Sequence, residues 1–154
     1  MKSEYMNIYN NLVKLTRNKD LYKYLKKQDT FSDRLTLLLL HFAFFLKAYK
    51  NDKNRKDLQD IYDFIFRQLE LSIREIGYGD QSINKKMKIY LNLFHDIIDK
   101  IHYWEKKSLS EKRLIFTKLI DISDNDDYLT EYFDLYLKNL LKKSLNFQTK
   151  RVIN

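Results

Sequence analysis

The sequence of 154 residues contains no cysteine and no proline, and it has only two glycines. Without cysteine, the chain has no disulfide, no thiolate for a metal ion and no thiol nucleophile, which fits a reducing compartment. The two glycines, Gly77 and Gly79, lie within three residues of each other. They therefore mark one place where the backbone is expected to adopt an unusual conformation.

The sequence also lacks an apolar run long enough to cross a membrane. The longest run, Leu35–Leu46, is interrupted by Thr36 and His41, whereas a membrane-spanning helix needs about 20 apolar residues. We expect this run to form a buried helix. The opening residues, MKSEYMNIYN, have an acidic side chain at position 4 and no following apolar stretch. They do not resemble a secretory signal, so we expect the protein to stay where it is made.

Basic residues outnumber acidic ones, 29 against 21, which gives a formal net charge of +8. This excess favours acidic partners, such as anionic lipid, nucleic acid, a ribosome surface or an acidic protein. An alternative is that a composition rich in Lys, Asn, Ile and Tyr reflects an A/T-biased genome and that the lysines are simply solvated. Acidic residues interspersed among the lysines argue against one dedicated binding stripe.

Apolar residues recur at intervals of three and four along most of the chain, which is typical of amphipathic helices. No stretch alternates apolar and polar residues for long enough to predict a strand. We therefore expect one compact all-α, multi-helix domain over residues 1–154, with residues 1–4 and 146–154 frayed. The expected helices cover about residues 5–18, 20–27, 32–49, 57–76, 83–104, 108–121 and 127–145.

No group of residues in the sequence predicts a catalytic or metal site. The three histidines are dispersed, and His41, inside the apolar run, is expected to be a core histidine bonded to a neighbour. The acidic residues Asp121, Asp124, Asp126 and Asp127 lack the glycine and the terminal glutamate of a calcium loop, so helix capping is the preferred interpretation. We expect a protein that is not an enzyme and that has no cofactor and no small-molecule substrate.

The two glycines predict a sharp corner between two helices. Gly77 follows an apolar periodic segment that ends at Ile76, where a helix often needs a left-handed residue. Asp80 or Ser82 can then cap the next helix. A phosphate-binding loop is a weaker interpretation, because such loops follow a strand and contain more glycines.

Charged residues surround this corner. The spacing predicts surface ion pairs between Asp63 and Arg67 and between Glu70 and Arg74. Three lysines, Lys85, Lys86 and Lys88, follow the corner, and in the first turn of a helix they would lie at the unfavourable end of its dipole. A cluster that does not serve helix stability is a candidate for contact with an anionic partner.

This part of the sequence resembles the ubiquinol-cytochrome c chaperone family. The resemblance depends on Arg-Glu-x-Gly-x-Gly-Asp at 74–80 and Lys-Lys-Met-Lys at 85–88, supported by RLTLLLLH at 34–41 and IYDFIFRQLELSIRE at 61–75. It extends over about Tyr9 to Leu140. Members of this family are assembly factors for respiratory complex III.

The resemblance implies a non-enzymatic chaperone that binds newly made cytochrome b, or another complex III subunit, during assembly of ubiquinol-cytochrome c reductase. We expect a cytoplasmic protein or one that lies peripherally at the inner membrane, and the basic residues favour the ribosome or an anionic membrane surface as further partners. A basic RNA- or ribosome-binding helical module is the alternative function. Gly77 and Gly79 would shape the corner, and the expected partner-binding residues are Arg74, Glu75, Asp80, Lys85, Lys86 and Lys88.

Overall fold

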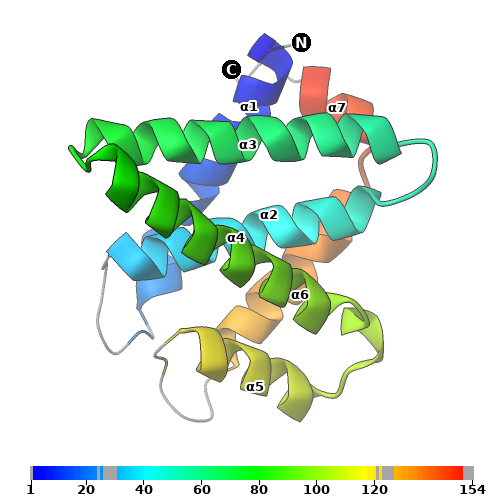
Figure 1. The fold of residues 1–154 in the computed structure, drawn as a ribbon. Coiled ribbons are helices and arrows are strands. Elements are labelled where there is room, and N and C mark those ends of the chain that lie inside the picture. The colour runs from blue at the N-terminus through cyan, green and yellow to red at the C-terminus, as the bar shows by residue number, and fades with distance from the viewer. Residues whose placement is uncertain (1, 24, 26–30, 121, 123–126, 151–154) are drawn as a thin grey trace.

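Helices make up nearly all of the regular structure. The computed structural model describes residues 2–23, 25, 31–120, 122 and 127–150. Its α-helices are α1 (Lys2–Thr16), α2 (Phe31–Tyr49), α3 (Arg55–Glu75), α4 (Asp80–Ile101), α5 (Leu109–Leu119), α6 (Tyr128–Leu141) and α7 (Leu145–Lys150) (Figure 1). Two 3₁₀ helices, η1 (Lys19–Tyr22) and η2 (Trp104–Lys106), connect α-helices.

The prediction of an all-α fold is confirmed for the described residues. They contain no strand, and the only β-type pairing among them is an isolated antiparallel bridge between Leu25 and Ile122. The short helix expected over residues 20–27 is a 3₁₀ turn, Lys19–Tyr22, and residues 24, 26 and 27 of that stretch lie outside the description.

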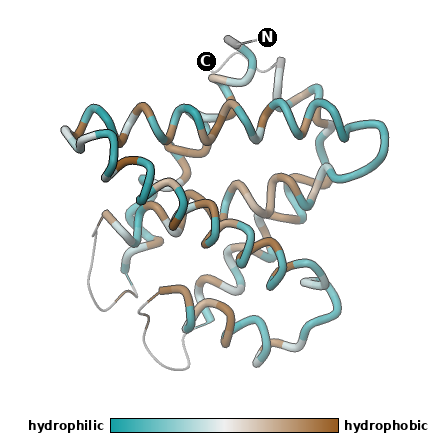
Figure 2. The backbone as a smooth tube through the Cα atoms, in the orientation of Figure 1, coloured by the Kyte–Doolittle hydropathy of each residue, from teal (hydrophilic) through white to brown (hydrophobic). Residues whose placement is uncertain are grey.

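Helix α2 forms the centre of the domain. Apolar side chains project from all faces of this helix, and such a helix is stable only when other helices surround it. It packs against α1, α4 and α6, and Figure 2 shows its apolar residues running through the middle of the molecule. The expectation that residues 35–46 form a buried helix is therefore confirmed. The fully enclosed residues include Leu37, Leu39, Leu40, Phe42, Ala43 and Phe44.

Helices α3 and α4 are amphipathic and turn one face toward the core. On α3 the buried residues are Ile61, Ile65, Phe66, Leu69 and Ile73. On α4 they are Ile83, Met87, Phe94, Ile97 and Ile101. These intervals of three, four and seven place each set on a single stripe, which leaves the opposite face of each helix to solvent.

Aromatic rings join the helices at the core. Phe42 of α2 stacks on Phe94 of α4 with ring centroids 5.2 Å apart. Phe44 of α2 stacks on Phe133 of α6 at 5.0 Å, and Trp104 meets Phe44 edge to face at 5.0 Å. Offset and edge-to-face pairs of this kind add stability beyond the apolar area that they bury. The rings therefore fix how α2, α4 and α6 are positioned relative to one another.

The start of α5 follows the sequence prediction. The Ser108 side chain accepts a hydrogen bond from the Glu111 amide at 3.2 Å, and the Glu111 carboxylate accepts one from the Ser108 amide at 3.0 Å. This reciprocal capping box satisfies two amides that lack partners within the helix.

The start of α6 does not follow the capping prediction. Asp127 occupies the N-cap position but makes no side-chain capping bond. Its carboxylate instead accepts two hydrogen bonds from Arg113 of α5, at 2.6 and 2.9 Å, and the guanidinium lowers the pKa of Asp127. Capping by Asp127 is therefore wrong, because a charged partner from another helix holds the carboxylate. The capping predicted for Asp121, Asp124 and Asp126 lies outside the described residues.

The last predicted helix, residues 127–145, is divided in two. Helix α6 ends at Leu141 and α7 follows from Leu145 to Lys150. Helix α7 packs against α1, so the first and the last helix of the described residues lie next to each other (Figure 1). The expected fraying of residues 1–4 and 146–154 concerns motion and stays a prediction.

Candidate partner-binding site

The corner between α3 and α4 is a short, fully exposed turn. Helix α3 ends at Glu75 and α4 begins at Asp80, and every residue from Arg74 to Ser82 is exposed. The two helices diverge from this turn, which lies at the edge of the molecule (Figure 1). The backbone amide of Gly77 donates to the Arg74 carbonyl at 2.9 Å and closes the end of α3.

The two glycines have different roles. Gly77 has φ of 103°, in the region that L side chains rarely adopt. Gly79 has an ordinary extended conformation, φ −72° and ψ 163°, and occupies the N-cap position of α4. Neither glycine faces a close neighbour that would exclude a Cβ. Backbone conformation therefore requires glycine at Gly77 alone.

The prediction that Asp80 or Ser82 caps α4 is wrong. Gly79 is the N-cap, and it has no side chain that could accept a hydrogen bond from the first turn. Asp80 is the first helical residue, and its carboxylate is turned to Arg74 instead. An acid in this turn still interacts favourably with the positive end of the helix dipole.

Interactions of the Arg74 side chain connect the end of α3 to the start of α4. Its Nη1 donates to Asp80 Oδ1 at 2.5 Å, and its Nε lies 3.9 Å from Glu70 Oε2. The hydrogen bond from Arg74 to Asp80 raises the pKa of the guanidinium. The predicted pair of Glu70 and Arg74 is thus present. The Asp63 carboxylate, predicted to pair with Arg67, accepts a hydrogen bond from Gln59 at 3.0 Å.

The three lysines lie farther along α4 than the sequence suggested. Because α4 begins at Asp80, Lys85 falls in its second turn and Lys88 in its third, where the helix dipole has little effect. The dipole argument for their function therefore does not apply. Lys85 and Lys88 are exposed, whereas Lys86 is half-buried with its Nζ 4.5 Å from the centre of the Tyr78 ring.

The six expected site residues differ in whether their charges have a partner in the described part of the chain. Arg74 and Asp80 bind each other, and Lys86 rests on an aromatic ring. Within the described part of the chain, no ion-pair partner is found for Glu75, Lys85 or Lys88. The corner also exposes two apolar side chains that the sequence did not single out, Ile76 at 57% and Tyr78 at 41%.

The interpretation of His41 as a bonded core histidine is confirmed. The ring is completely buried. Its Nδ1 donates to the Leu37 carbonyl at 2.7 Å, and its Nε2 accepts from the Tyr132 hydroxyl at 2.6 Å. Burial lowers the pKa of His41 to about 4, which outweighs the opposite effect of the Leu37 hydrogen bond. His41 is therefore a neutral structural residue at physiological pH.

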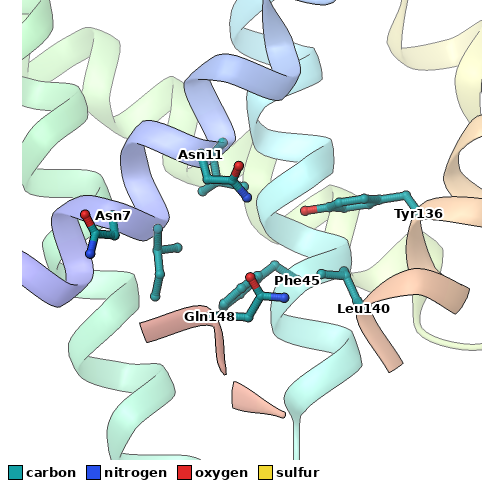
Figure 3. Close-up of a pocket in the computed structure, with 8 residues that line it drawn as sticks. Asn7, Asn11, Phe45, Tyr136, Leu140 and Gln148 are labelled. Carbon is teal, nitrogen blue, oxygen red and sulfur yellow. The ribbon is translucent and has the colours of Figure 1, made fainter. Parts of the chain in front are cut away.

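A small cavity with polar and apolar walls lies where α1, α2, α6 and α7 meet. Asn7, Asn11, Tyr136 and Gln148 project around it, with Phe45 and Leu140 beside them (Figure 3). Its volume is about 20 Å³, which is enough for a single water molecule. The Gln148 amide also donates to the Tyr49 hydroxyl at 3.1 Å, which ties α7 to α2.

Neither a metal cluster nor a membrane-spanning helix occurs among the residues that the structure describes. No three His, Asp or Glu side chains of these residues come together as ligands. None of the helices in this part of the chain combines the length and the apolar character needed to cross a bilayer.

The fold and this site define an all-α protein that presents an exposed, charged helix corner. The sequence model described as "Ubiquinol-cytochrome C chaperone" matches residues 23–109, which is more than half of the chain and includes the whole corner. The chain belongs to the ubiquinol-cytochrome c chaperone family, whose role is in complex III assembly. The match is shorter than the expected span of Tyr9 to Leu140 and leaves out α1 and α6. No curated protein and no solved structure gives a significant match.

Proposed function

We propose that this protein is a non-enzymatic assembly chaperone that binds newly made cytochrome b and assists assembly of ubiquinol-cytochrome c reductase. Membership of the ubiquinol-cytochrome c chaperone family, matched over residues 23–109, carries this proposal. The finer step, from a role in complex III assembly to cytochrome b as the client, follows the family resemblance of the corner motif at 74–80.

The proposed recognition residues are those of the corner, Arg74, Glu75, Asp80, Lys85, Lys86 and Lys88. The exposed side chains of Glu75, Lys85 and Lys88 support this, because no ion-pair partner is found for them in the described part of the chain. The exposed apolar side chains of Ile76 and Tyr78 support it as well. A surface that combines charged and apolar groups suits a client whose apolar segments are flanked by polar ones. The pair of Arg74 and Asp80 would keep the turn in one shape while the other groups make contact.

Deletion of the gene tests the function itself. We expect assembled complex III and cytochrome b to fall while the other respiratory complexes keep their levels. Blue-native gels and haem spectra of membranes measure both, and a plasmid copy of the gene should restore them. Normal cytochrome b in the deletion strain would contradict the proposal.

Substitution of the three corner lysines tests the site. The triple variant Lys85→Gln, Lys86→Gln, Lys88→Gln should bind cytochrome b about five- to tenfold more weakly, since each exposed ion pair contributes up to about 1 kcal/mol. The control Lys138→Gln, Lys142→Gln, Lys143→Gln removes three exposed charges at the end of α6. Both variants lower the net charge equally, so equal losses of copurified cytochrome b would show that overall charge, not the corner, matters.

A basic RNA- or ribosome-binding module is the second candidate, and the net charge of +8 favours it. The dependence on salt separates the two functions. Binding to phosphates weakens steeply from low to physiological salt, whereas a client interface with apolar contacts should retain most of its affinity. Tight binding to structured RNA at high salt, without capture of cytochrome b, would favour the second function. Flotation assays with anionic vesicles at low and physiological salt test whether the protein binds a membrane surface.

A further inference from the structure

Polar side chains from three helices surround the small cavity of Figure 3. Asn7 and Asn11 reach it from α1, Tyr136 from α6 and Gln148 from α7. A bound water molecule needs a polar site of at least about 10–15 Å³ with two to four hydrogen-bond partners, and this cavity measures about 20 Å³. An organic ligand needs about 300 Å³ or more. The size of the cavity therefore selects an occupant as small as water.

The Tyr136 hydroxyl is the group in this cavity that most needs a partner. Its oxygen points toward Asn11 and Gln148 (Figure 3), and within the described part of the chain it has no hydrogen-bond partner. Burial raises the pKa of this hydroxyl, so it stays protonated and can both donate and accept a hydrogen bond. A phenol placed inside a protein without a partner loses the hydrogen bonds that it makes in water. A water molecule in the cavity would restore them.

The two amides beside the hydroxyl have hydrogen-bonding groups to offer. The Gln148 side-chain nitrogen donates to the Tyr49 hydroxyl at 3.1 Å, whereas no described residue donates to its oxygen. The Asn11 amide, on an exposed residue beside the cavity, likewise has no partner in this part of the chain. A buried water molecule makes about three hydrogen bonds. The hydroxyl and the two amides supply that number.

A metal ion fits the same groups poorly. Among the described residues that line the cavity, none is acidic, and half are apolar. A hard cation takes six or more oxygen ligands, usually with carboxylates among them. Water is neutral and matches a hydroxyl and two amides, because it donates and accepts in equal measure.

Helix α7 depends on contacts of this kind. It has six residues, and isolated helices shorter than about 12–15 residues are marginal in water. Leu145 buries its side chain in the core, and the bond from Gln148 to Tyr49 connects α7 to α2. Tyr49 in turn donates to the Leu140 carbonyl at 2.8 Å. A water molecule beside these bonds would connect α7 to α1 and α6 as well.

We propose that one water molecule binds in this cavity and joins the Tyr136 hydroxyl, the Asn11 amide and the Gln148 side-chain oxygen, so that solvent forms part of the contact that holds α7 on the domain. Its partners come from α1, α6 and α7. The water thus connects the first and the last helix of the described residues. This inference goes beyond the proposed chaperone function and does not depend on it, because none of its tests involves cytochrome b.

A crystal structure of the full chain, at a resolution that shows ordered water, tests the site directly. We expect one peak in the cavity at a hydrogen-bonding distance of about 2.5–3.2 Å from the Tyr136 hydroxyl oxygen and from the Asn11 and Gln148 amides. A cavity without a peak overturns the proposal. So does a peak with six or more oxygen ligands, because it would be a metal ion.

The variant Tyr136→Phe removes the hydroxyl and keeps the ring, whose centroid lies 5.1 Å from that of His41. The water peak should disappear. Hydrogen exchange of the C-terminal peptide that contains α7 should become about fivefold faster, as expected for the loss of one hydrogen bond. Tyr90→Phe on α4 is the matched control, because Tyr90 is also half-buried and does not line the cavity. Equal exchange of α7 in the two variants would show that the hydroxyl holds no water that matters to α7.

A second substitution distinguishes a shared water from separate contacts. Asn11→Ala should speed the exchange of α7 in the wild type but add nothing in Tyr136→Phe, because either change removes the same water. Asn10→Ala is the control for helix propensity, since Asn10 is the exposed neighbour on α1 and does not line the cavity. It should leave the exchange of α7 unchanged in both backgrounds. Additive effects of Asn11→Ala and Tyr136→Phe would mean that the two side chains act independently, and the proposed bridge would then be wrong.

Discussion

His41 illustrates how one polar side chain is accommodated inside an apolar helix. Each ring nitrogen has a partner, the Leu37 carbonyl on its own helix and the Tyr132 hydroxyl on α6. Three aromatic rings of α6 surround the imidazole, with centroids 5.0 to 5.4 Å away. With both nitrogens satisfied, the neutral ring is buried at little cost, whereas a charged ring would lose its hydration.

The buried state of His41 predicts a pH dependence of stability. Its pKa is about 4 in the fold, against an ordinary value of 6.5. The unfolded chain therefore takes up a proton between pH 6.5 and 4 that the folded chain does not. Stability is complete above pH 6.5 and falls toward pH 4, in total by about 3 kcal/mol from this residue. Urea unfolding at several pH values measures it.

The variant His41→Gln is the control for that pH dependence. Its free energy of unfolding should be lower at neutral pH, because a close-packed site is disturbed, but the decline from pH 6.5 to 4 should be smaller than in the wild type. An equal decline in both proteins would mean that carboxylates cause it. The burial of His41 and its bond to a neighbour followed from the sequence. Its partner Tyr132, 91 residues away, did not, because only packing brings α2 and α6 together.

The corner between α3 and α4 depends on the conformation of one residue. Gly77 has a positive φ and lets the chain leave α3, whereas Gly79 has a conformation open to any residue. The sequence indicated the position of the corner because the only two glycines lie there. It did not distinguish the two glycines, since that depends on the direction in which α4 leaves the turn.

Substitution of each glycine should reveal this difference. Gly77→Ala is expected to destabilise the fold by about 1–2 kcal/mol, because a Cβ is strained at positive φ even without a close neighbour. Gly79→Ala should change stability by less than about 0.5 kcal/mol, as a weaker N-cap is offset by a less flexible unfolded chain. Thermal unfolding of the two variants, side by side, measures both. Equal losses would contradict the assignment.

Helix caps show where local sequence rules succeed and fail. The helix start predicted at about residue 108 is present and carries a capping box of Ser108 and Glu111, which depends only on partners within four residues of each other. Asp80 and Asp127 were predicted as caps and are not, because Arg74 and Arg113 hold their carboxylates. A carboxylate can accept charge-assisted hydrogen bonds either from the amides of a helix start or from an arginine, and only the fold decides whether an arginine is near enough to hold it.

The whole molecule is larger than the part that the family model matches. Residues 23–109 contain α2, α3 and α4, but the core also needs α1 and α6. Helix α1 contributes Tyr5, Ile8 and Leu12, and α6 contributes Leu129, Phe133, Leu137 and Leu140. At roughly 2 kcal/mol for each buried side chain, their removal would cost as much as the whole stability of a domain, about 5–15 kcal/mol.

The fragment 23–109 should therefore fail to fold by itself. We expect it to lack near-ultraviolet circular dichroism and a cooperative thermal transition, since α2 would lose its contacts with α1 and α6. A chain shortened only to residues 1–150 keeps α1 to α7 and should unfold as the full chain does. A cooperative transition of fragment 23–109 would show that α2, α3 and α4 form an independent core.

The sequence by itself determined the helical class, the buried position of residues 35–46 and the place of the corner, because periodicity, apolar runs and glycine act over a few neighbouring residues. Tertiary structure decided which charges are paired and which glycine carries the strained conformation. Those features depend on how the helices meet, as Arg113 of α5 meets Asp127 before α6, and packing of the core around α2 sets these distances.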